Sequence, residues 1–160
     1  MNIILRPLQE NDNKLFHRWW NDQEICMLTS ATSELMPFDE INEIIIKHLI
    51  NPDGTDFIIE ADSQPIGHIL IKKDQRKKYY SVYIAIGEKD YWGKGYGTKA
   101  LMLACNWFWQ KFPHEEMLEL EVNTTNRRAY HCYEKVGFCK IRLKKYKDFP
   151  ETYLMRINRD

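Results

Sequence analysis

The sequence predicts an α+β domain in which helices cover a mixed central β-sheet of about seven strands. Some short segments alternate apolar with polar residues, which is typical of strands, whereas others repeat apolar residues every three to four positions, as helices do. Along the chain these segments follow the order β-α-α-β-β-β-α-β-α-β-β. The strand–loop–helix–strand passage at mid-chain is a crossover connection, so the sheet is expected to be mixed.

The expected strands are short runs, several of them rich in β-branched and aromatic residues. They cover residues 3–8, 57–60, 65–71, 79–86, 118–122, 138–143 and 152–157. Pro7 suits a first strand at the edge of the sheet. The fifth strand alternates strictly, which places Glu119 and Glu121 on one face and three apolar residues on the other.

Four helices are expected from their apolar period and from the residues at their ends. They cover residues from about 11 to 22, from 38 to 51, from a glycine-rich loop to Pro113, and from about 126 to 136. Asn11 and Asp12 are typical helix caps, and Gly137 is a typical C-terminal stop. Residues 25–37 show a mixed pattern and are expected to connect the first two helices.

Composition limits the classes of partner. Residues 1–160, of which 44% are hydrophobic, suit a single domain. Lys plus Arg and Asp plus Glu both number 23, which gives no support for a nucleic-acid or membrane partner. The four cysteines form no Cys-x-x-Cys pair, and the five histidines lack metal-ligand spacing. We therefore expect a cytoplasmic protein without a metal, either a monomer or a homodimer.

A glycine-rich segment, Tyr91-Trp92-Gly93-Lys94-Gly95-Tyr96-Gly97-Thr98, separates the strand at 79–86 from the next helix. Closely spaced glycines let consecutive backbone N–H groups turn toward one point, and the following helix adds its own unpaired N–H groups. This pattern favours a phosphate-binding loop. Its spacing fits neither the dinucleotide-binding nor the Walker motif. Taken alone, the loop is equally consistent with an ordinary turn before a helix.

The order of elements, the loop at 92–98 and the downstream segment at 126–138 resemble the GCN5-related N-acetyltransferase (GNAT) superfamily over essentially the whole chain. The chain is most similar to the branch of ribosomal-protein alanine N-acetyltransferases, diamine acetyltransferases and aminoglycoside 6′-acetyltransferases, partly through Trp19-Trp20-Asn21-Asp22. The resemblance implies the α/β/α-layered GNAT fold with splayed middle strands. It also implies acetyl-coenzyme A as donor and direct attack by a primary amine in a ternary complex.

In this superfamily the pyrophosphate of coenzyme A (CoA) lies on the glycine loop, and the pantetheine arm pairs with the strand before it. The residues that the resemblance assigns to the cofactor are Ala85, Ile86, Gly87, Trp92, Gly93, Lys94, Gly95, Tyr96, Gly97, Thr98, Asn126 and Arg128. Trp92 stands where the superfamily's Q/R-x-x-G-x-G/A loop carries Gln or Arg, whereas Gly95 and Gly97 match that pattern. The backbone cradle is therefore expected to persist with one side-chain contact changed.

The resemblance also assigns catalytic roles. Tyr133 matches the superfamily tyrosine that protonates the CoA thiolate, and it follows Asn126 by two helical turns. Glu121 matches the position of a general base in some ribosomal-protein alanine acetyltransferases. Alternatives remain for both residues: Tyr133 as a core aromatic, and Glu121 as a solvent-facing carboxylate on an alternating strand. A base is also unnecessary if the amine loses its proton to water.

The acceptor is expected to enter over the first two helices, where Trp19, Trp20, Asp22 and Glu24 are the predicted pocket residues. Acidic side chains suit a cationic amine, although they also serve as helix caps, and the tryptophans also suit core packing. The acceptor is either a small-molecule amine or a protein N-terminus. A non-catalytic acyl-CoA-binding module is the main alternative function, and a nucleic-acid binder is disfavoured by the balanced charge.

Overall fold

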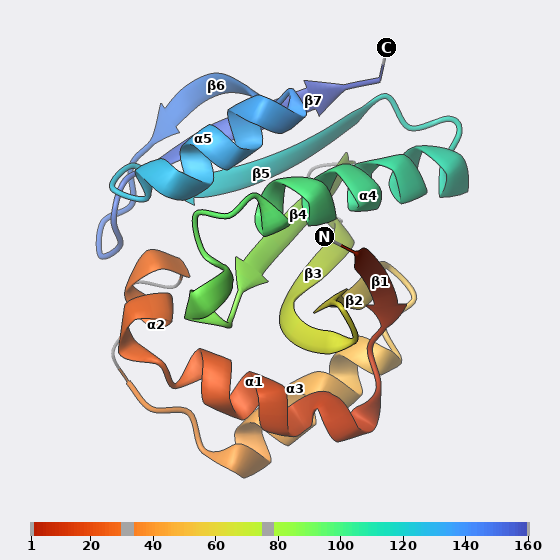
Figure 1. Ribbon diagram of the computed structural model, residues 1–160. Helices are drawn as coiled ribbons and strands as arrows, with labels where there is room; N and C mark the ends of the chain where they lie inside the picture. Colours follow the sequence, from red (N-terminus) through yellow and green to blue (C-terminus); the bar gives the residue numbers. More distant parts are fainter. Residues whose placement is uncertain (1, 30–33, 75–78, 160) are drawn as a thin grey trace.

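The computed structural model describes residues 2–29, 34–74 and 79–159 (Figure 1). The elements in chain order are β1 (Ile3–Pro7), a 3-10 turn η1 (Glu10–Asp12), α1 (Asn13–Trp20), α2 (Gln23–Thr29), α3 (Phe38–Leu49), β2 (Gly54–Ala61), β3 (Gln64–Asp74), β4 (Tyr79–Ile86), a 3-10 turn η2 (Lys89–Tyr91), α4 (Tyr96–Lys111), β5 (Met117–Asn123), α5 (Arg127–Val136), β6 (Cys139–Lys144) and β7 (Thr152–Asn158).

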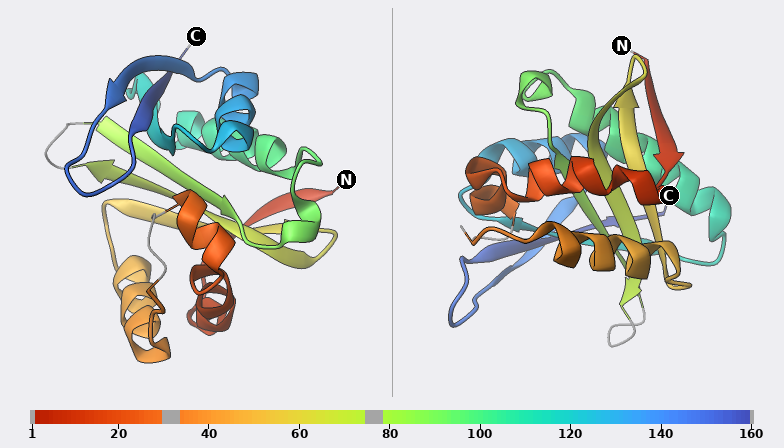
Figure 2. Two further views of the ribbon diagram at one scale, coloured as in Figure 1. Left: turned by 90° about the vertical axis from the view of Figure 1, so that its left-hand side faces the viewer. Right: turned by 90° about the horizontal axis from the view of Figure 1, so that it is seen from below.

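The strands form one sheet in the order β1-β2-β3-β4-β5-β7-β6. Neighbouring strands are antiparallel except β4 and β5, which are parallel. Helices α4 and α5 cover one face of the sheet, and α1 and α3 lie across the other (Figure 2). The predicted mixed sheet between helical layers is therefore confirmed.

The two parallel strands separate soon after they meet. β4 and β5 pair only at Tyr80 with Leu118 and at Ser81 with Glu119. Beyond these pairs the strands diverge toward their C-terminal ends (Figure 1). The predicted splay of the middle strands is confirmed, and it opens the sheet between the two helical layers.

Two hydrophobic cores hold the layers in place. The larger core joins the sheet to α4 and α5, and it contains Leu101, Phe108 and Leu120. The smaller core joins the opposite face to α1 and α3, and it contains Phe16 and Ile45. Because each core is anchored on a different face, both walls of the opening between β4 and β5 rest on packed side chains.

Local signals fix the helices that border this opening. Gly95, with a φ of +84°, precedes α4, since this left-handed conformation is accessible to glycine at little cost. The Asn126 side chain caps α5 by accepting a hydrogen bond from the Ala129 N–H at 3.1 Å. Gly137 ends α5 with a φ of +111°, as predicted.

The main departure from the sequence prediction is α2, which lies partly in the segment expected to be a connection. The Asp22 carboxylate starts this helix by accepting hydrogen bonds from the N–H groups of Glu24 and Ile25. Of its seven residues, only Ile25 and Cys26 are buried. A helix this short has too few buried positions to show a period.

A smaller departure concerns the first helix, whose predicted cap has another partner. Asp12 binds Arg6 through both carboxylate oxygens, at 2.8 and 2.9 Å, and also accepts a hydrogen bond from the Gln9 N–H. The hairpin of β2 and β3 is also longer than expected, and it turns at Asp62 and Ser63, both with positive φ.

Candidate active site

The opening between β4 and β5 forms a cleft of about 940 Å³. Its walls come from residues 81–86 of β4 and 119–123 of β5, together with the glycine loop and α5. Residues of α1 and α2 line its other side. The cleft therefore runs through the sheet at the point where the strand pairing stops.

The glycine loop presents free backbone donors to the cleft. Gly93 and Gly95 have φ values of +72° and +84°, the left-handed region that favours glycine. The helix that follows has no side-chain cap, and within the described residues the N–H groups of Tyr96, Gly97 and Thr98 donate to no other group. Together with the helix dipole, these donors suit a phosphate group.

Trp92 takes a different role from the Gln or Arg expected at its position. Its indole Nε1 donates to the Ile86 carbonyl at 2.7 Å, which ties the loop to the end of β4. The guanidinium of Arg128 stacks on its ring with 3.8 Å between Cζ and the ring centroid. Both side chains line the cleft. The positive charge near the loop thus comes from α5, whereas Lys94 does not line the cleft.

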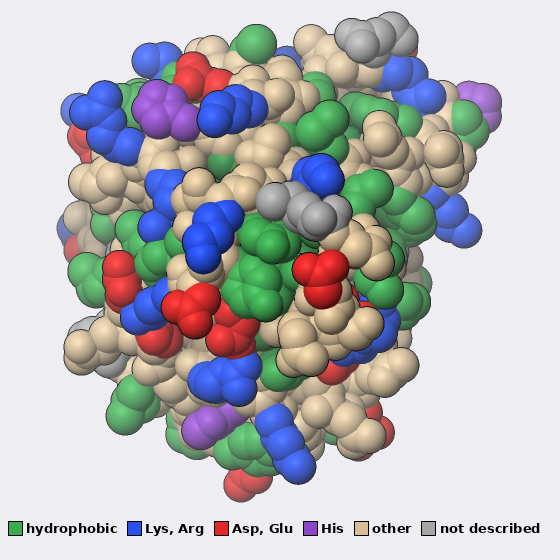
Figure 3. Space-filling view, viewed as in Figure 1, with side chains coloured by type: hydrophobic (Ala, Val, Ile, Leu, Met, Phe, Trp, Pro, Cys, Tyr) green, Lys and Arg blue, Asp and Glu red, His purple; other side chains and the backbone are tan. Residues whose placement is uncertain are grey.

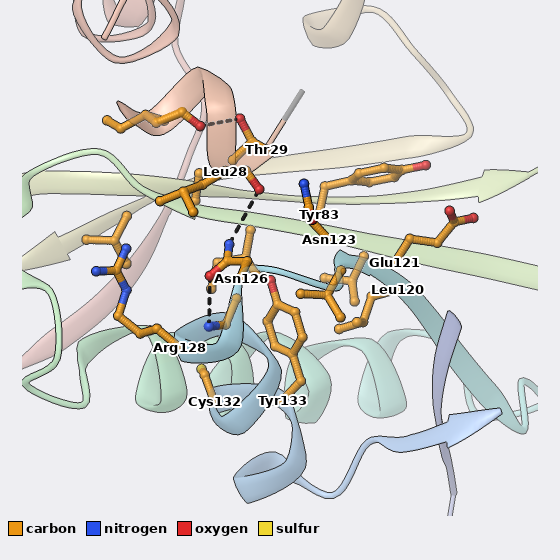
Figure 4. Close-up of a pocket in the computed structure, with 18 of the residues that line it drawn as sticks. Leu28, Thr29, Tyr83, Leu120, Glu121, Asn123, Asn126, Arg128, Cys132 and Tyr133 are labelled. Carbon is orange, nitrogen blue, oxygen red and sulfur yellow. Dashed lines mark hydrogen bonds between the residues drawn. The ribbon is translucent and has the colours of Figure 1, made fainter. Parts of the chain in front are cut away.

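Tyr133 reaches the cleft from α5, extending toward the gap between the strands (Figure 4). Its side chain is 8% exposed, and burial raises the pKa of the phenol well above its ordinary value. The hydroxyl is therefore protonated at neutral pH and able to act as a donor. Two turns earlier, Asn126 also donates to the Leu28 carbonyl at 3.4 Å, which links α5 to α2.

Glu121 lies at the outer edge of the cleft, where three donors from the β6–β7 segment surround its carboxylate. Lys144 forms an ion pair with it, Tyr146 donates at 2.6 Å, and Thr152 donates at 3.0 Å. Burial alone would raise the pKa of Glu121, but these hydrogen bonds outweigh burial and lower it. Glu121 is thus ionised at neutral pH.

The structure brings only two of the four predicted acceptor residues to the cleft. Trp19 and Trp20 line it, and Trp19 is fixed by its Nε1 donating to Glu88 at 2.8 Å. Asp22 and Glu24 lie outside the cleft and both pair with Lys89, at 2.8 and 3.0 Å. Both carboxylates are therefore already engaged by one ammonium group of the protein.

On the cofactor side, Ala85 and Ile86 line the cleft and Gly87 does not. The Gly87 N–H donates to the Ile66 carbonyl at 2.8 Å, and the ring of Trp19 packs where a side chain would begin. The backbone available to a ligand on this strand therefore ends at Ile86.

Residues 2–139 match the family model described as Acetyltransferase (GNAT) domain. The chain belongs to the GNAT acetyltransferase family. The superfamily indicated by the loop and the α5 motif is thereby confirmed.

Named relatives of this GNAT chain act on different amines. Spermidine N(1)-acetyltransferase of Escherichia coli K12 is 26% identical over 137 residues, covering 86% of this chain and 73% of that protein. N-alpha-acetyltransferase of Sulfurisphaera tokodaii is 28% identical over 147 residues, covering 84% of each. The crystal structure of spermidine N-acetyltransferase from Vibrio cholerae with CoA and spermine has a TM-score of 0.84 at 22% identity, covering 98% of this chain and 95% of that one. This last likeness supports the fold.

Three further observations concern the described part of the GNAT domain. There, no group of three or more His, Cys, Asp or Glu side chains is placed to hold a metal ion. Across residues 2–29, 34–74 and 79–159, no helix combines the length and apolar character needed to cross a membrane. On the face shown in Figure 3, acidic and basic side chains are interspersed.

Sequence reasoning missed His68, which lines the cleft from β3. Its Nδ1 is buried with no hydrogen-bond partner among the described residues, and its ring lies 4.8 Å from that of Phe16 and 6.3 Å from that of Trp19. Burial lowers the pKa of His68 to about 4. Metal-ligand spacing says nothing of a buried histidine, whereas an apolar residue on either side of the Gly67-His68 pair is a sequence signal for one.

We predict that His68 makes the GNAT domain less stable in mild acid. Between an unfolded pKa of about 6.5 and the folded value of about 4, the unfolded chain binds a proton that the folded chain does not. Acidification from about pH 7 to about pH 4.5 should therefore reduce the free energy of unfolding by up to about 2 kcal/mol through this residue. His68→Gln should lack that part of the loss in urea unfolding. If the free energy of unfolding of the wild type and of His68→Gln fell equally with pH, the prediction would be wrong.

Proposed function

We propose that this protein is an N-acetyltransferase that moves the acetyl group of acetyl-CoA to a primary amine by direct attack in a ternary complex. One observation carries the proposal: the free N–H groups at the start of α4 and the protonated phenol of Tyr133 open onto the same cleft. An anion-binding cradle and a proton donor are the two groups that transfer from a CoA thioester requires.

The residues of the cleft fit a CoA thioester. The cradle at Gly93–Thr98 offers unpaired donors for a pyrophosphate, and Arg128, held on Trp92, adds positive charge beside it. Ala85 and Ile86 offer β4 backbone that β5 does not pair. Asn126 would fix the α5 side of the same channel. When bound, acetyl-CoA supplies the activated acyl group.

Tyr133 is the proposed general acid, which gives its hydroxyl proton to the departing thiolate. Its raised pKa keeps the phenol protonated at neutral pH, so the proton is available when the thiolate leaves. Glu121 is the proposed general base. Its carboxylate is ionised and partly exposed, so we propose that it receives the amine's proton through water.

The acceptor remains one of two classes in this proposal. Trp20 is partly exposed and gives the acceptor side an aromatic surface, which suits the alkyl portion of an amine and, by cation–π contact, its charge. Trp19 is only 1% exposed and contributes through packing. The relatives named for spermidine and for N-alpha acetylation support a small-molecule amine and a protein N-terminus respectively. Both classes carry the primary amine that the cleft must admit.

The direct test measures release of the CoA thiol from acetyl-CoA against a panel of amines, followed by mass spectrometry of the product. The panel contains spermidine, an aminoglycoside and peptides with free N-termini. We expect thiol release with at least one amine and a mass increase of one acetyl group on it. Tight CoA binding without any acetylated product would instead identify a non-catalytic acyl-CoA-binding module.

Tyr133→Phe should lower kcat by about 100-fold or more, because the proton donor to the leaving group is lost. The dissociation constant of CoA should change by less than about threefold, since the ring still fills its buried place. Tyr130→Phe is the matched control: it lies on the same helix, packs against Tyr153 and does not line the cleft. Wild-type turnover in Tyr133→Phe would remove the proposed acid.

Arg128→Ala should weaken CoA binding by about tenfold, as expected for loss of one charge-assisted phosphate contact. Trp92→Leu should have a similar effect, and the double variant should be no weaker than either single one, because the indole acts by holding the guanidinium. Arg127→Ala, the exposed neighbour outside the cleft, is the control. Additive losses, measured by calorimetric titration with CoA, would show that the two residues act separately.

A further inference from the structure

The acceptor face of β5 carries a second carboxylate that the proposed mechanism leaves unused. Leu118, Leu120 and Val122 belong to the core beneath α4, so the alternating Glu119 and Glu121 point to the opposite face, over which α1 and α3 lie. Both glutamates line the cleft. They differ in depth and in what their oxygens contact.

Glu119 occupies the closed end of the cleft. It forms the last pair between β4 and β5, opposite Ser81, before the two strands diverge. Its residue is 1% exposed, and Ser81 is 8% exposed. An amine that approaches from the α1 side toward the gap where Tyr133 enters therefore meets the Glu119 face of the strand.

The two oxygens of Glu119 have unequal surroundings. Arg156, its register partner on β7, donates twice to Oε1, from Nε at 2.9 Å and from Nη2 at 2.5 Å. Oε2 is buried and has no hydrogen-bond partner within the described residues. A buried carboxylate oxygen without a donor is costly, so this position strongly favours a donor that arrives with a ligand.

Glu121, the other carboxylate on this face, is less available as a hydrogen-bond acceptor for a ligand. Glu121 already receives hydrogen bonds from Lys144, Tyr146 and Thr152. A new donor at Glu121 would have to compete with these groups. At Glu119 Oε2 a new donor would displace no existing hydrogen bond among the described residues.

We propose that Oε2 of Glu119 binds the reacting amine of the acceptor through a charge-assisted N–H···O hydrogen bond at the closed end of the cleft. This inference rests on the proposed N-acetyltransferase function and adds the residue that selects and orients a protonated primary amine. Arg156 is the positioning residue, because its fork on Oε1 fixes the carboxylate and directs Oε2. Glu121 keeps its separate place at the edge, where water reaches it.

The test is the amine KM of Glu119→Gln, measured at saturating acetyl-CoA with the panel amine that the wild-type protein acetylates fastest. We expect the amine KM to rise by about 10- to 100-fold, because a charged hydrogen bond is replaced by a neutral group. The dissociation constant of CoA, measured separately, should stay within about twofold. Arg156→Lys, which keeps a charged donor for Oε1, should raise the amine KM less than Glu119→Gln.

Glu60→Gln provides the matched control. Glu60 forms the same kind of pair, accepting from Arg6 Nε at 2.7 Å, but lies outside the cleft. Its amine KM should equal that of the wild type. If Glu119→Gln fails to fold, Glu119→Asp replaces it. The shorter side chain keeps a negative charge for Arg156 but moves the carboxylate oxygen that corresponds to Oε2 away from the amine. The amine KM should still rise by about tenfold.

The outcomes separate the two proposals. An amine KM unchanged in Glu119→Gln or Glu119→Asp, with or without a loss of stability or kcat, would assign Glu119 to the ion pair alone and overturn this inference. Wild-type protein that acetylates no amine would remove the N-acetyltransferase proposal and this one with it. If the wild type is active and the Glu119 variant has an unchanged amine KM, only the present inference is removed.

Discussion

The separation of β4 from β5 is the constraint on which the site depends. After the Ser81–Glu119 pair, the β4 backbone has no partner on β5, although parallel strands inside a sheet normally satisfy each other's N–H and C=O groups. The cores on the two faces keep the strands apart. The same separation makes room for a ligand, exposes strand backbone to it and lets Tyr133 reach through the layer from α5. In the proposed mechanism, cofactor and acceptor approach the gap from opposite faces of the sheet.

The cradle shows how a family site tolerates the loss of one side chain. In the proposed site backbone N–H groups bind the anion, so the glycines at 93 and 95 matter for their conformation rather than for any contact. Trp92 removes a polar side chain from the loop but provides a flat surface for Arg128. The charge is supplied from α5 instead of from the loop, and only the three-dimensional structure brings positions 92 and 128 together.

Much of the fold was predictable, because period and end signals are local properties of the sequence. The order of elements along the chain, the glycine loop before α4 and the Gly137 end of α5 all follow from neighbouring residues. The acceptor side of the cleft was not predictable, because charge pairs join residues that are far apart in the sequence. Asp22 and Glu24 were predicted substrate contacts, whereas in the structure both pair with Lys89, which is far along the chain. Helix α2 was missed because two buried residues do not establish a period.

The two glutamates of β5 show the same limit more sharply. Alternation places both on one face, and nothing in the strand itself distinguishes them. Their difference comes from later segments: β7 gives Glu119 a single arginine bound to one oxygen, whereas β6, β7 and the residues between them surround Glu121 with three donors. Among the described residues, Glu119 therefore keeps one oxygen open to a ligand, whereas the carboxylate of Glu121 already accepts from three donors. The chemistry of this face is therefore decided by where the last two strands put their donors.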